Sequence, residues 1–469
     1  MPVPHKYAYR SAYHFTHIDN LPTILHQGAL LAKNVESERG VTPLSVAYED
    51  IQDNRAGMGV PCGPGGVVHD YAPFYFCTLS SMLLAVVNRK IADQCELIYL
   101  CVPITAMERY PCVFTNASAN TKAPPQFFVD ASQLSSIDWD CVDNYRWSLG
   151  DEVKNQRRMA ELLFHRELPV AEVARVIVWN ESIRDRVNAI YAQAGLSAPQ
   201  IEFPPERQFY VTKFFSTDPL KRKHSTVIGP KGIREMWGQV EAMLKQRLAT
   251  SRQLEAPWFP TMGDLRDALA TNLGAIPETA PLVGLHTEGP FHSDDLASHT
   301  HRVLANLRAA VGFGNQPAEK RTVLELTACL HDIAKGIQDD VNRTPDGIKY
   351  KPDENHPVKG AAPVAELLLR RVQYLQVPEA VQLCKLVCYH DIVGGILNGR
   401  RIEELLIMAD SLAEVQMLIA IADADIADVN PGWLWDPRKA AKLQQIRDRA
   451  TAHFGAGQSG SGAQAMPRA

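Results

Sequence analysis

Short apolar or aromatic runs, each bounded by turn residues, recur through the first 215 residues of the chain. Runs of this length and composition predict β-strands, here at 72–78, 96–104, 175–180 and 208–215. Between them, apolar residues recur at helical spacing, with charged residues in the gaps. This spacing predicts helices over 20–28 and 151–168. The first half of the chain is therefore predicted to be a mixed α+β domain.

The pattern becomes purely helical after about residue 290. Apolar residues recur every three or four positions in five segments, and none of these shows the alternation of a strand. The segments are LASHTHRVLANLRAAV, RTVLELTACLHDIAKG, PVAELLLRRVQYL, PEAVQLCKLVCYH and AEVQMLIAIADADIA. This part is predicted to be an all-α domain.

The residues between these two regions predict a helical spacer followed by a proline-rich linker. A helical pattern at 234–249 is followed by four prolines before residue 285. The last residues are rich in Gly, Ser and Ala, which is typical of disorder. The expected parts are an N-terminal domain at 1–216, a spacer and linker at 217–285, a C-terminal domain at 286–454 and a disordered tail at 455–469.

Length and composition are those of an ordinary globular protein. At roughly 100–200 residues per domain, 469 residues suggest two or three domains. The net charge of −5 argues against a strongly basic nucleic-acid-binding domain, although a local basic groove is compatible with it. No secretory signal and no run of 18 apolar residues is found, so we expect a cytoplasmic protein with no membrane span. Nine cysteines without a CxxC pair predict free thiols in a reducing compartment.

Histidines and aspartates recur along the helical region, each in a distinct local context. They are His299 in SHTHRV, His331 and Asp332 in LHDIAKG, His356 in NHPVKGA, His390 in YHD and Asp425 in IADADIAD. Imidazole and carboxylate groups suit divalent cations such as Mn, Fe, Co, Ni and Zn. A single histidine on a helix is more often structural, and an HD dipeptide alone means little. The ordered set is what predicts a metal site that activates water against a phosphate ester.

This ordered set resembles the HD superfamily of metal-dependent phosphohydrolases over roughly 290–440. It looks most like the uridylyl-removing half of the bifunctional PII-regulating enzyme, including the tail ADIADVNPGWLWD. The resemblance implies a divalent ion (Mn, Fe, Co, Ni, Zn or Mg) and hydrolysis of a phosphomonoester or phosphodiester. The implied core ligands are His299, His331, Asp332 and Asp425, with His356 and His390 as added ligands or phosphate-binding groups and Lys335 as a substrate contact. His301 competes with His299, and Asp423 with Asp425, for these roles.

Glu161 is the most notable charged residue of the first half. It lies in QRRMAELLFH between apolar neighbours, so a partly buried carboxylate is expected. Such a carboxylate stabilises an oxocarbenium-like transition state electrostatically. The Gly/Pro-rich stretch after residue 53 can bring backbone N–H groups near a phosphate, although most such loops are only loops. No GxGxxG or Walker sequence is present.

The region 8–215 is similar to the DarT family of DNA ADP-ribosyltransferases. The matching stretches are YHFTHIDNLPTIL, DNRAGMGVP, GGVVHDYAPFYF with the following SML, and RRMAELL, in the family's order. The resemblance implies transfer of ADP-ribose from NAD to a base of single-stranded DNA, thymine in one branch and guanine in another. Together the two resemblances imply an α+β ADP-ribosyltransferase-like domain followed by an all-α HD domain.

The DarT resemblance also implies roles for individual residues. Arg55 would hold the NAD phosphates, and Glu161 would position the nicotinamide ribose and help the base lose its proton. His14, Thr16 and Asn20 would line the NAD pocket, with Tyr71 in its wall. The loop at about 116–150 would recognise the DNA, but its start departs from the family's Asp-Gly form, which leaves the base open with thymine favoured. Five aromatic residues of this loop are candidates for base stacking or for core packing: Phe127, Phe128, Trp139, Tyr145 and Trp147.

The leading hypothesis is a fusion of two enzymes, a toxin-like DNA ADP-ribosyltransferase and a phosphohydrolase acting on a nucleotide, a nucleic acid or the ADP-ribosylated product. A separate antitoxin protein is a possible partner. One rival has the HD domain as the sole enzyme and the N-terminal domain as a sensor of NAD or nucleic acid. A second rival is a binding protein with neither activity, against which the intact ligand set argues.

Overall fold

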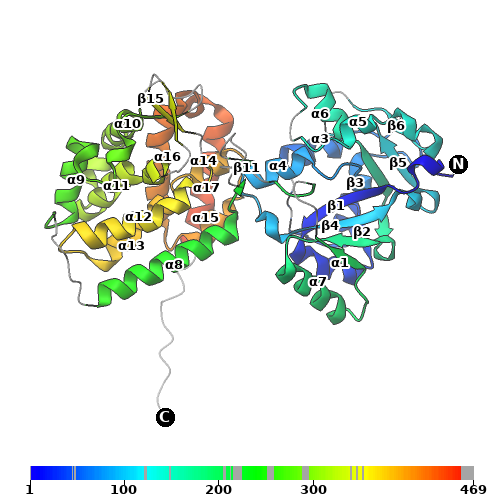
Figure 1. Ribbon diagram of the computed structural model, residues 1–469, viewed down its shortest axis with the longest axis horizontal. Coiled ribbons are helices and arrows are strands. Elements are labelled where there is room, and N and C mark those ends of the chain that lie inside the picture. The colour runs from blue at the N-terminus through cyan, green and yellow to red at the C-terminus, as the bar shows by residue number, and fades with distance from the viewer. Residues whose placement is uncertain are drawn as a thin grey trace, which may run out of the picture. The chain divides into compact units, whose positions relative to one another are not determined.

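The computed structural model describes residues 2–44, 46, 49–120, 124–146, 149–203, 208–211, 213–214, 224–225, 227–250, 258–287, 295–337, 341–344, 347–350 and 353–455. The chain divides into two compact units, Met1–Lys213 and Phe214–Ala469 (Figure 1). Each unit has its own apolar core.

An eight-stranded sheet forms the centre of the first unit, in the order β10-β9-β4-β1-β3-β7-β5-β6. β9 and β10 are parallel, and the other neighbouring strands are antiparallel. The strands are β1 (Ser11–His17), β3 (Tyr71–Tyr75), β4 (Leu97–Pro103), β5 (Cys112–Thr115), β6 (Phe127–Phe128), β7 (Glu161–His165), β9 (Arg175–Ile177) and β10 (Gln200–Glu202). β2 (Ala29–Leu31) and β8 (Glu167–Pro169) form a separate antiparallel pair.

The sheet is weakly joined between β1 and β3. β1 pairs with β4 along its whole length but meets β3 only at Tyr13 and Tyr75. Pro73 of β3 has no N–H group with which to extend the ladder. The His14 side chain reaches across instead, with Nδ1 2.8 Å from the Pro73 carbonyl oxygen. Because a carbonyl only accepts, Nδ1 carries the proton and Nε2 is left as an acceptor.

Helices cover the sheet, and α1 and α7 lie side by side (Figure 1). α1 begins after Asn20 and ends at Gly28, whose φ of 69° is the left-handed conformation that favours glycine. The helices of this unit are α1 (Leu21–Gln27), α2 (Lys33–Glu38), α3 (Glu49–Gly57), α4 (Ser81–Asn88), α5 (Trp139–Val142), α6 (Glu152–Arg158) and α7 (Glu181–Gln193).

The predicted helix over 151–168 is wrong in its second half. α6 ends at Arg158, and the chain then forms β7 and β8. Four of the five residues of β7 are buried, because this strand lies between β3 and β5. A strand buried on both faces has a continuous apolar run, which periodicity does not distinguish from a buried helix.

The predicted strand at 208–215 is also largely wrong. Of the residues of this segment that the structure describes, 208–211 are not in a strand, and Lys213–Phe214 (β11) pairs with His224–Ser225 (β12). Segment 208–211 is held by side chains instead. The Tyr99 hydroxyl donates to the Phe209 carbonyl at 2.7 Å, and the Gln94 amide bonds both N and O of Val211. These bonds replace a strand ladder.

The second unit is mostly helical and is built around one apolar core. Its helices are α8 (Pro230–Ala249), α9 (Met262–Thr271), α10 (Leu296–Ala309), α11 (Ala318–Leu330), α12 (His356–Arg371), α13 (Val377–Tyr389), α14 (Ile392–Leu397), α15 (Ile402–Met408), α16 (Leu412–Val429) and α17 (Pro437–Gly455). Trp237 and Leu244 of α8 and Leu265 of α9 join this core. Much of the expected spacer at 217–285 is therefore packed against the helices that follow.

The expectation of an all-α second domain is wrong in one place. β13 (Leu285–Thr287), β14 (Val341–Thr344) and β15 (Gly347–Tyr350) form a small sheet in the order β13-β15-β14. The strands are short and polar, so their pattern is weak beside that of the helices. The Pro-Asp-Gly sequence at 345–347 was the available turn signal. The expected disordered tail lies outside the described residues except for Gly455, which ends α17.

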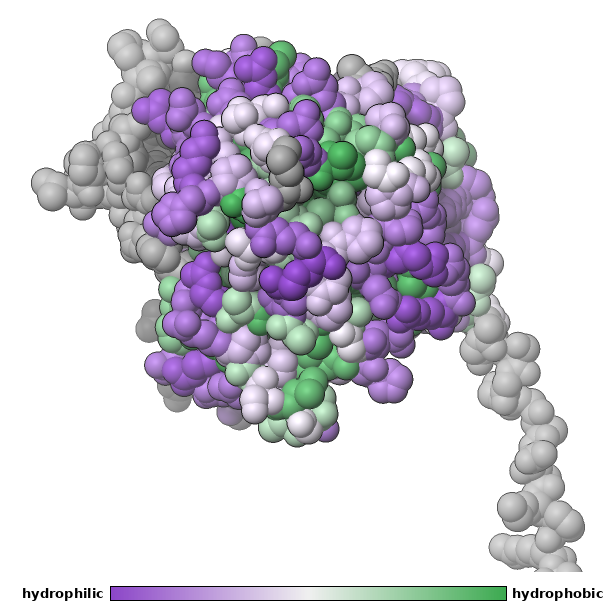
Figure 2. Space-filling model, turned by 90° about the vertical axis from the view of Figure 1, so that its right-hand side faces the viewer, coloured by the Kyte–Doolittle hydropathy of each residue, from purple (hydrophilic) through white to green (hydrophobic). Residues whose placement is uncertain are grey.

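All nine cysteines are free, and seven of them are buried. One stretch of the described residues, Val377–Leu397, is long and apolar enough to cross a membrane by composition alone. It forms α13 and α14, and 72% of its most apolar window is buried within the protein. The face shown in Figure 2 is dominated by hydrophilic side chains, with apolar ones in smaller groups between them.

A buried lysine in the second unit offers a test of this packing. Lys385 of α13 is 6% exposed, and its Nζ lies 3.0 Å from Glu414 of α16, which is 4% exposed. We expect Lys385→Met to leave the Glu414 carboxylate buried without its cation, at a cost of about 3–5 kcal/mol in the free energy of unfolding. A urea titration followed by far-UV circular dichroism measures this. Lys245→Met, which removes an exposed pair with Glu241, should change it little, and equal effects of the two substitutions would contradict the prediction.

Candidate functional sites

Arg55 and Glu161, the two expected catalytic residues of the first unit, form a buried ion pair. Arg55 lies near the end of α3 and Glu161 at the start of β7, and they are 7% and 0% exposed. The Arg55 Nη1 atom lies 3.0 and 2.9 Å from the two Glu161 carboxylate oxygens. The Ala119 N–H also donates to Oε1 at 2.8 Å. Both oxygens therefore have donors, which offsets the cost of burying the charge.

The Glu161 carboxylate favours the charged form of Arg55. Burial alone would lower the pKa of Arg55, but the Glu161 carboxylate raises it above its ordinary value. Tyr75 lies opposite Glu161 in the β3–β7 register, and burial together with the nearby carboxylate raises the pKa of its hydroxyl. A carboxylate held in this way can stabilise a positive charge that develops beside it. A guanidinium offers several N–H donors to phosphate oxygens.

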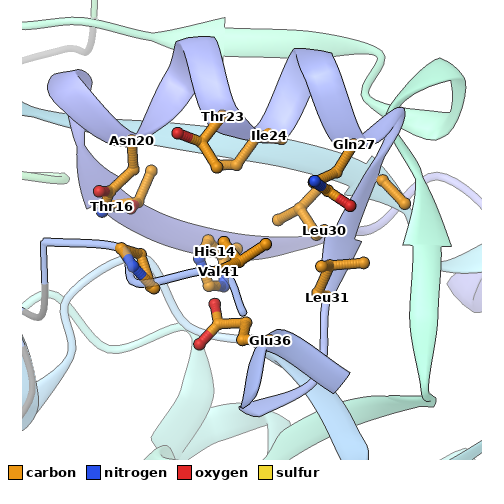
Figure 3. A pocket seen from close by; sticks show the side chains of 12 residues that line it. His14, Thr16, Asn20, Thr23, Ile24, Gln27, Leu30, Leu31, Glu36 and Val41 are labelled. Atoms are coloured by element: carbon orange, nitrogen blue, oxygen red, sulfur yellow. Dashed lines mark hydrogen bonds between the residues drawn. The ribbon is translucent and has the colours of Figure 1, made fainter. Parts of the chain in front are cut away.

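A pocket with about 440 Å³ of empty space opens between β1, α1, β2 and α2 (Figure 3). Its lining contains three of the four residues expected to line the NAD pocket, namely His14, Thr16 and Asn20, whereas Arg55 and Glu161 are not part of it. The remaining lining residues are Thr23, Ile24, Gln27, Ala29, Leu30, Leu31, Glu36, Val41 and Pro43. Burial lowers the pKa of His14, although its bond to the Pro73 carbonyl opposes this, so the ring is neutral.

Asn20 shapes the pocket by holding a neighbouring segment of backbone. Its amide nitrogen donates to the Leu44 carbonyl at 2.9 Å and to the Thr16 hydroxyl at 3.0 Å. Its amide oxygen accepts from the Leu44 N–H at 2.7 Å. Both ends of the amide are therefore engaged within the protein, and Asn20 positions the segment before Leu44 beside the pocket.

Tyr71, the fourth residue expected in the wall of the NAD site, is not among the residues that line this pocket. Its ring is buried among Val60, Val68 and Val113, and its hydroxyl donates to the Gly65 carbonyl at 2.8 Å. Tyr71 begins β3, at the other end of the strand from Tyr75, and so packs under the Gly-rich segment near Gly65.

The expected DNA-recognition loop is described at 116–120, 124–146 and 149–150. Phe128 stacks on Phe114 and Trp139 on Tyr7, with ring centroids 5.2 Å apart in each pair, so these two candidates for base stacking pack inside the protein. Tyr145 is 54% exposed. Trp147 lies outside the described residues.

The expected metal ligands of the second unit gather in two groups, His299 with His331 and Asp425, and Asp332 with His356 and His390. Within each group, one donor atom per residue lies within 4.8 Å of the others. The six residues come from five places in the fold: His299 from α10, His331 and Asp332 from the end of α11, His356 from the start of α12, His390 from the end of α13 and Asp425 from α16.

All four histidines turn the same ring nitrogen inward. Each Nδ1 contacts an oxygen: that of His299 lies 2.7 Å from the Asp428 carboxylate, and those of His331, His356 and His390 lie 2.8, 2.6 and 2.8 Å from the carbonyls of Ala328, Asp353 and Val387. The carbonyl contacts place the proton on Nδ1 and leave Nε2 as a lone-pair donor. The Nε2 atoms meet in pairs, His299 with His331 and His356 with His390, each at 3.3 Å.

The donor set fits a divalent cation. Asp332 is 2% exposed, and its Oδ1 atom accepts no hydrogen bond among the described residues. Burial would lower the pKa of His299, but hydrogen bonds to Asp425 and Asp428 raise it to about 9. The negative charge that favours a proton there favours a cation equally. Imidazole nitrogens and carboxylate oxygens are the donors that borderline divalent metals prefer.

Asp428 is a site residue that the sequence analysis missed. Its carboxylate contacts His299 Nδ1 at 2.7 Å and Arg302 Nη2 at 3.2 Å. Burial would raise the pKa of Asp428, but these partners lower it to about 2. A carboxylate on the far nitrogen orients a metal-binding imidazole and raises its basicity. The available signal was the spacing of three residues from Asp425, which places both carboxylates on one side of α16.

Three further residues of the second unit, Lys335, His301 and Asp423, were candidates for substrate or metal contact. Lys335 Nζ lies 2.6 Å from Asp332 Oδ2, so the expected phosphate contact is paired with a ligand carboxylate. His301 and Asp423, the alternatives to His299 and Asp425, are in neither ligand group. The buried Nε2 atom of His301 has no hydrogen-bond partner among the described residues, and Asp423 lies 3.8 Å from Arg447.

Comparison with known proteins places the first unit in a family. Residues 13–211 match the family described as ssDNA thymidine ADP-ribosyltransferase, DarT. A DNA ADP-ribosyl transferase of Thermus sp. (strain 2.9) is 33% identical over 186 residues, which are 39% of this chain and 87% of the relative. Another from Thermus aquaticus is 35% identical over 200 residues, which are 42% of this chain and 85% of the relative.

A solved structure is also similar. Thermus sp. 2.9 DarT in complex with ADP-ribosylated ssDNA is 29% identical and aligns with 45% of this chain and 99% of its own, with a TM-score of 0.40. The two sequence relatives are matched over most of their length, and the family match lies within the first unit. Through residues 13–211, this chain belongs to the DarT family of DNA ADP-ribosyltransferases.

Proposed function

We propose that the first unit transfers ADP-ribose from NAD to a base in single-stranded DNA, with thymine favoured and guanine as the alternative. The buried contact between Arg55 and Glu161 carries the proposal. These residues lie at the family's catalytic positions, 106 residues apart in sequence, and they meet in the fold. The family description and the relatives named DNA ADP-ribosyl transferase support the same activity.

The residues of the first unit suit this reaction. NAD would supply an ADP-ribosyl group joined to a positively charged nicotinamide. The Glu161 carboxylate stabilises the positive charge that develops as that bond breaks and helps the base lose its proton. Arg55 offers donors to the phosphates, while the Ala119 N–H continues to hold Glu161. The pocket at His14 and Thr16 is lined by apolar side chains together with a few polar ones, as small-molecule sites usually are.

The wider biological role is part of the proposal. The resemblance to the DarT family implies a toxin-like transferase, so a partner antitoxin protein that restrains it or removes the modification is expected. We expect the protein to act in the cytoplasm, where NAD and single-stranded DNA are both present, and not at a membrane.

We further propose that the second unit is a metal-dependent phosphohydrolase of the HD type. The four inward-facing Nε2 atoms, together with Asp332 and Asp425, support this. His299, His331, Asp332 and Asp425 would hold a divalent ion (Mn, Fe, Co, Ni, Zn or Mg), with His356 and His390 as further ligands. Such an ion lowers the pKa of bound water and neutralises phosphate charge. Lys335, beside Asp332, would contact a substrate phosphate.

The substrate class of this second site is a nucleotide, a nucleic acid or the ADP-ribosylated product of the first. The alternative is that the phosphohydrolase is the only enzyme and the first unit is a sensor of NAD or nucleic acid. Consumption of NAD by the purified chain separates the two hypotheses, because a sensor binds NAD without breaking it.

Substitution of Glu161 tests the proposed transferase. Glu161→Gln keeps the shape of the side chain but removes the charge, so we expect the rate of ADP-ribose transfer to fall by about 100-fold or more. The measurement is the mass gain of one ADP-ribose on a pool of single-stranded oligonucleotides with NAD, read by mass spectrometry. Glu167→Gln, an exposed substitution on the neighbouring β8, serves as the control and should retain activity. Transfer that survives in Glu161→Gln at the wild-type rate would refute the assigned role.

Substitution of Asp428 tests the proposed metal site. Asp428→Asn weakens the bond that orients His299, so we expect the affinity for Mn²⁺ to fall about 10–100-fold. Calorimetric titration of metal-stripped full-length protein with Mn²⁺ measures this without any substrate. Asp423→Asn, on the same helix but outside both ligand groups, should bind like the wild type. An unchanged affinity in Asp428→Asn would remove the orienting role.

A further inference from the structure

We propose that Glu36 makes the pocket of the first unit select NAD and reject NADP. The inference rests on the proposed transferase function and adds the residue that discriminates between the two dinucleotides. The pocket would hold the adenosine ribose, whose 2′ position is where the two dinucleotides differ. NADP carries a phosphate on the 2′ oxygen, and NAD does not.

Among the described residues that line this pocket, Glu36 is the one that carries a carboxylate. It lies on α2, its side chain is 19% exposed, and its carboxylate is directed into the cavity on the same side as His14 (Figure 3). The helix α2 lies between Ala32 and Arg39, and no functional role was predicted for this segment. A carboxylate facing a cavity accepts hydrogen bonds and repels anions.

His14 presents a second acceptor to the same space. Its Nδ1 proton is used by the Pro73 carbonyl, and the ring is neutral, so Nε2 can only accept. Two acceptors in one pocket favour a ligand group that donates hydrogen bonds. A ribose diol has two O–H donors and meets this requirement, whereas a 2′-phosphate brings only acceptors and negative charge. An acidic residue has the same role toward ribose in other dinucleotide sites.

Lys33 gives Glu36 a second way to disfavour NADP. Its Nζ lies 3.1 Å from Glu36 Oε2, and its side chain is 44% exposed. While Glu36 is charged, the lysine is neutralised locally and offers little attraction to a phosphate. Removing the carboxylate charge would therefore relieve a repulsion and also release a cation next to the pocket.

The test compares NAD⁺ and NADP⁺ on the full-length chain, by calorimetric titration of binding and by the oligonucleotide transfer assay with each dinucleotide. We expect the wild type to prefer NAD⁺ by more than tenfold. In Glu36→Gln the preference should fall at least tenfold, through weaker NAD⁺ and stronger NADP⁺ binding. Adding Lys33→Met to Glu36→Gln should remove the gain for NADP⁺.

Glu38→Gln is the matched control, because Glu38 lies on the same helix, pairs with Arg166 and does not line the pocket. It should keep the wild-type ratio, and unfolding temperatures without nucleotide confirm that each variant folds. Equal affinity of the wild type for the two dinucleotides, or an unchanged ratio in Glu36→Gln, overturns the inference. A wild type that binds neither dinucleotide instead refutes the proposed transferase function.

Discussion

The buried ion pair between Arg55 and Glu161 is the interaction on which the organisation of the first unit depends. A carboxylate at the start of an interior strand is tolerated only when donors surround it, and here a guanidinium and the Ala119 N–H meet that demand. The requirement ties α3 and the start of the expected DNA-recognition loop to β7. Three segments that are distant in sequence are thereby brought to one charged point, where the proposed chemistry needs them.

In the second unit, four imidazole rings from distant segments likewise meet at one place. Each ring is oriented by an oxygen on its outer nitrogen, so the protein's own hydrogen bonds turn the inner nitrogens toward one another. For three rings the oxygen is a carbonyl three residues earlier in the same helix or turn, which the backbone supplies regardless of sequence. His299 differs, because its oxygen is the Asp428 side chain on another helix. This ring is therefore the one whose orientation a single substitution can change.

The sequence was most informative where chemistry depends on residue type and order, and least where it depends on packing. The ligand candidates around His331 and the burial of Glu161 were predictable from local context. The strand at β7 was not, because a strand buried on both faces and a buried helix have the same apolar run. Asp428 was missed because its role comes from a contact between α10 and α16, which no local pattern reveals.

The hydrogen-bond partners of the residues around the pocket distinguish those that hold the surrounding structure from those that can bind a ligand. Asn20 lines the pocket, yet both ends of its amide are engaged by the protein, and the hydroxyl of Tyr71 is likewise satisfied at Gly65. His14 has one nitrogen satisfied and one facing the cavity. A family resemblance indicates which residues lie near a site. Whether such a residue can bind a ligand depends on whether it has a polar atom without a hydrogen-bond partner in the protein. By this criterion His14 is the residue that we expect to meet a ligand, whereas the polar groups of Asn20 and Tyr71 are engaged within the protein.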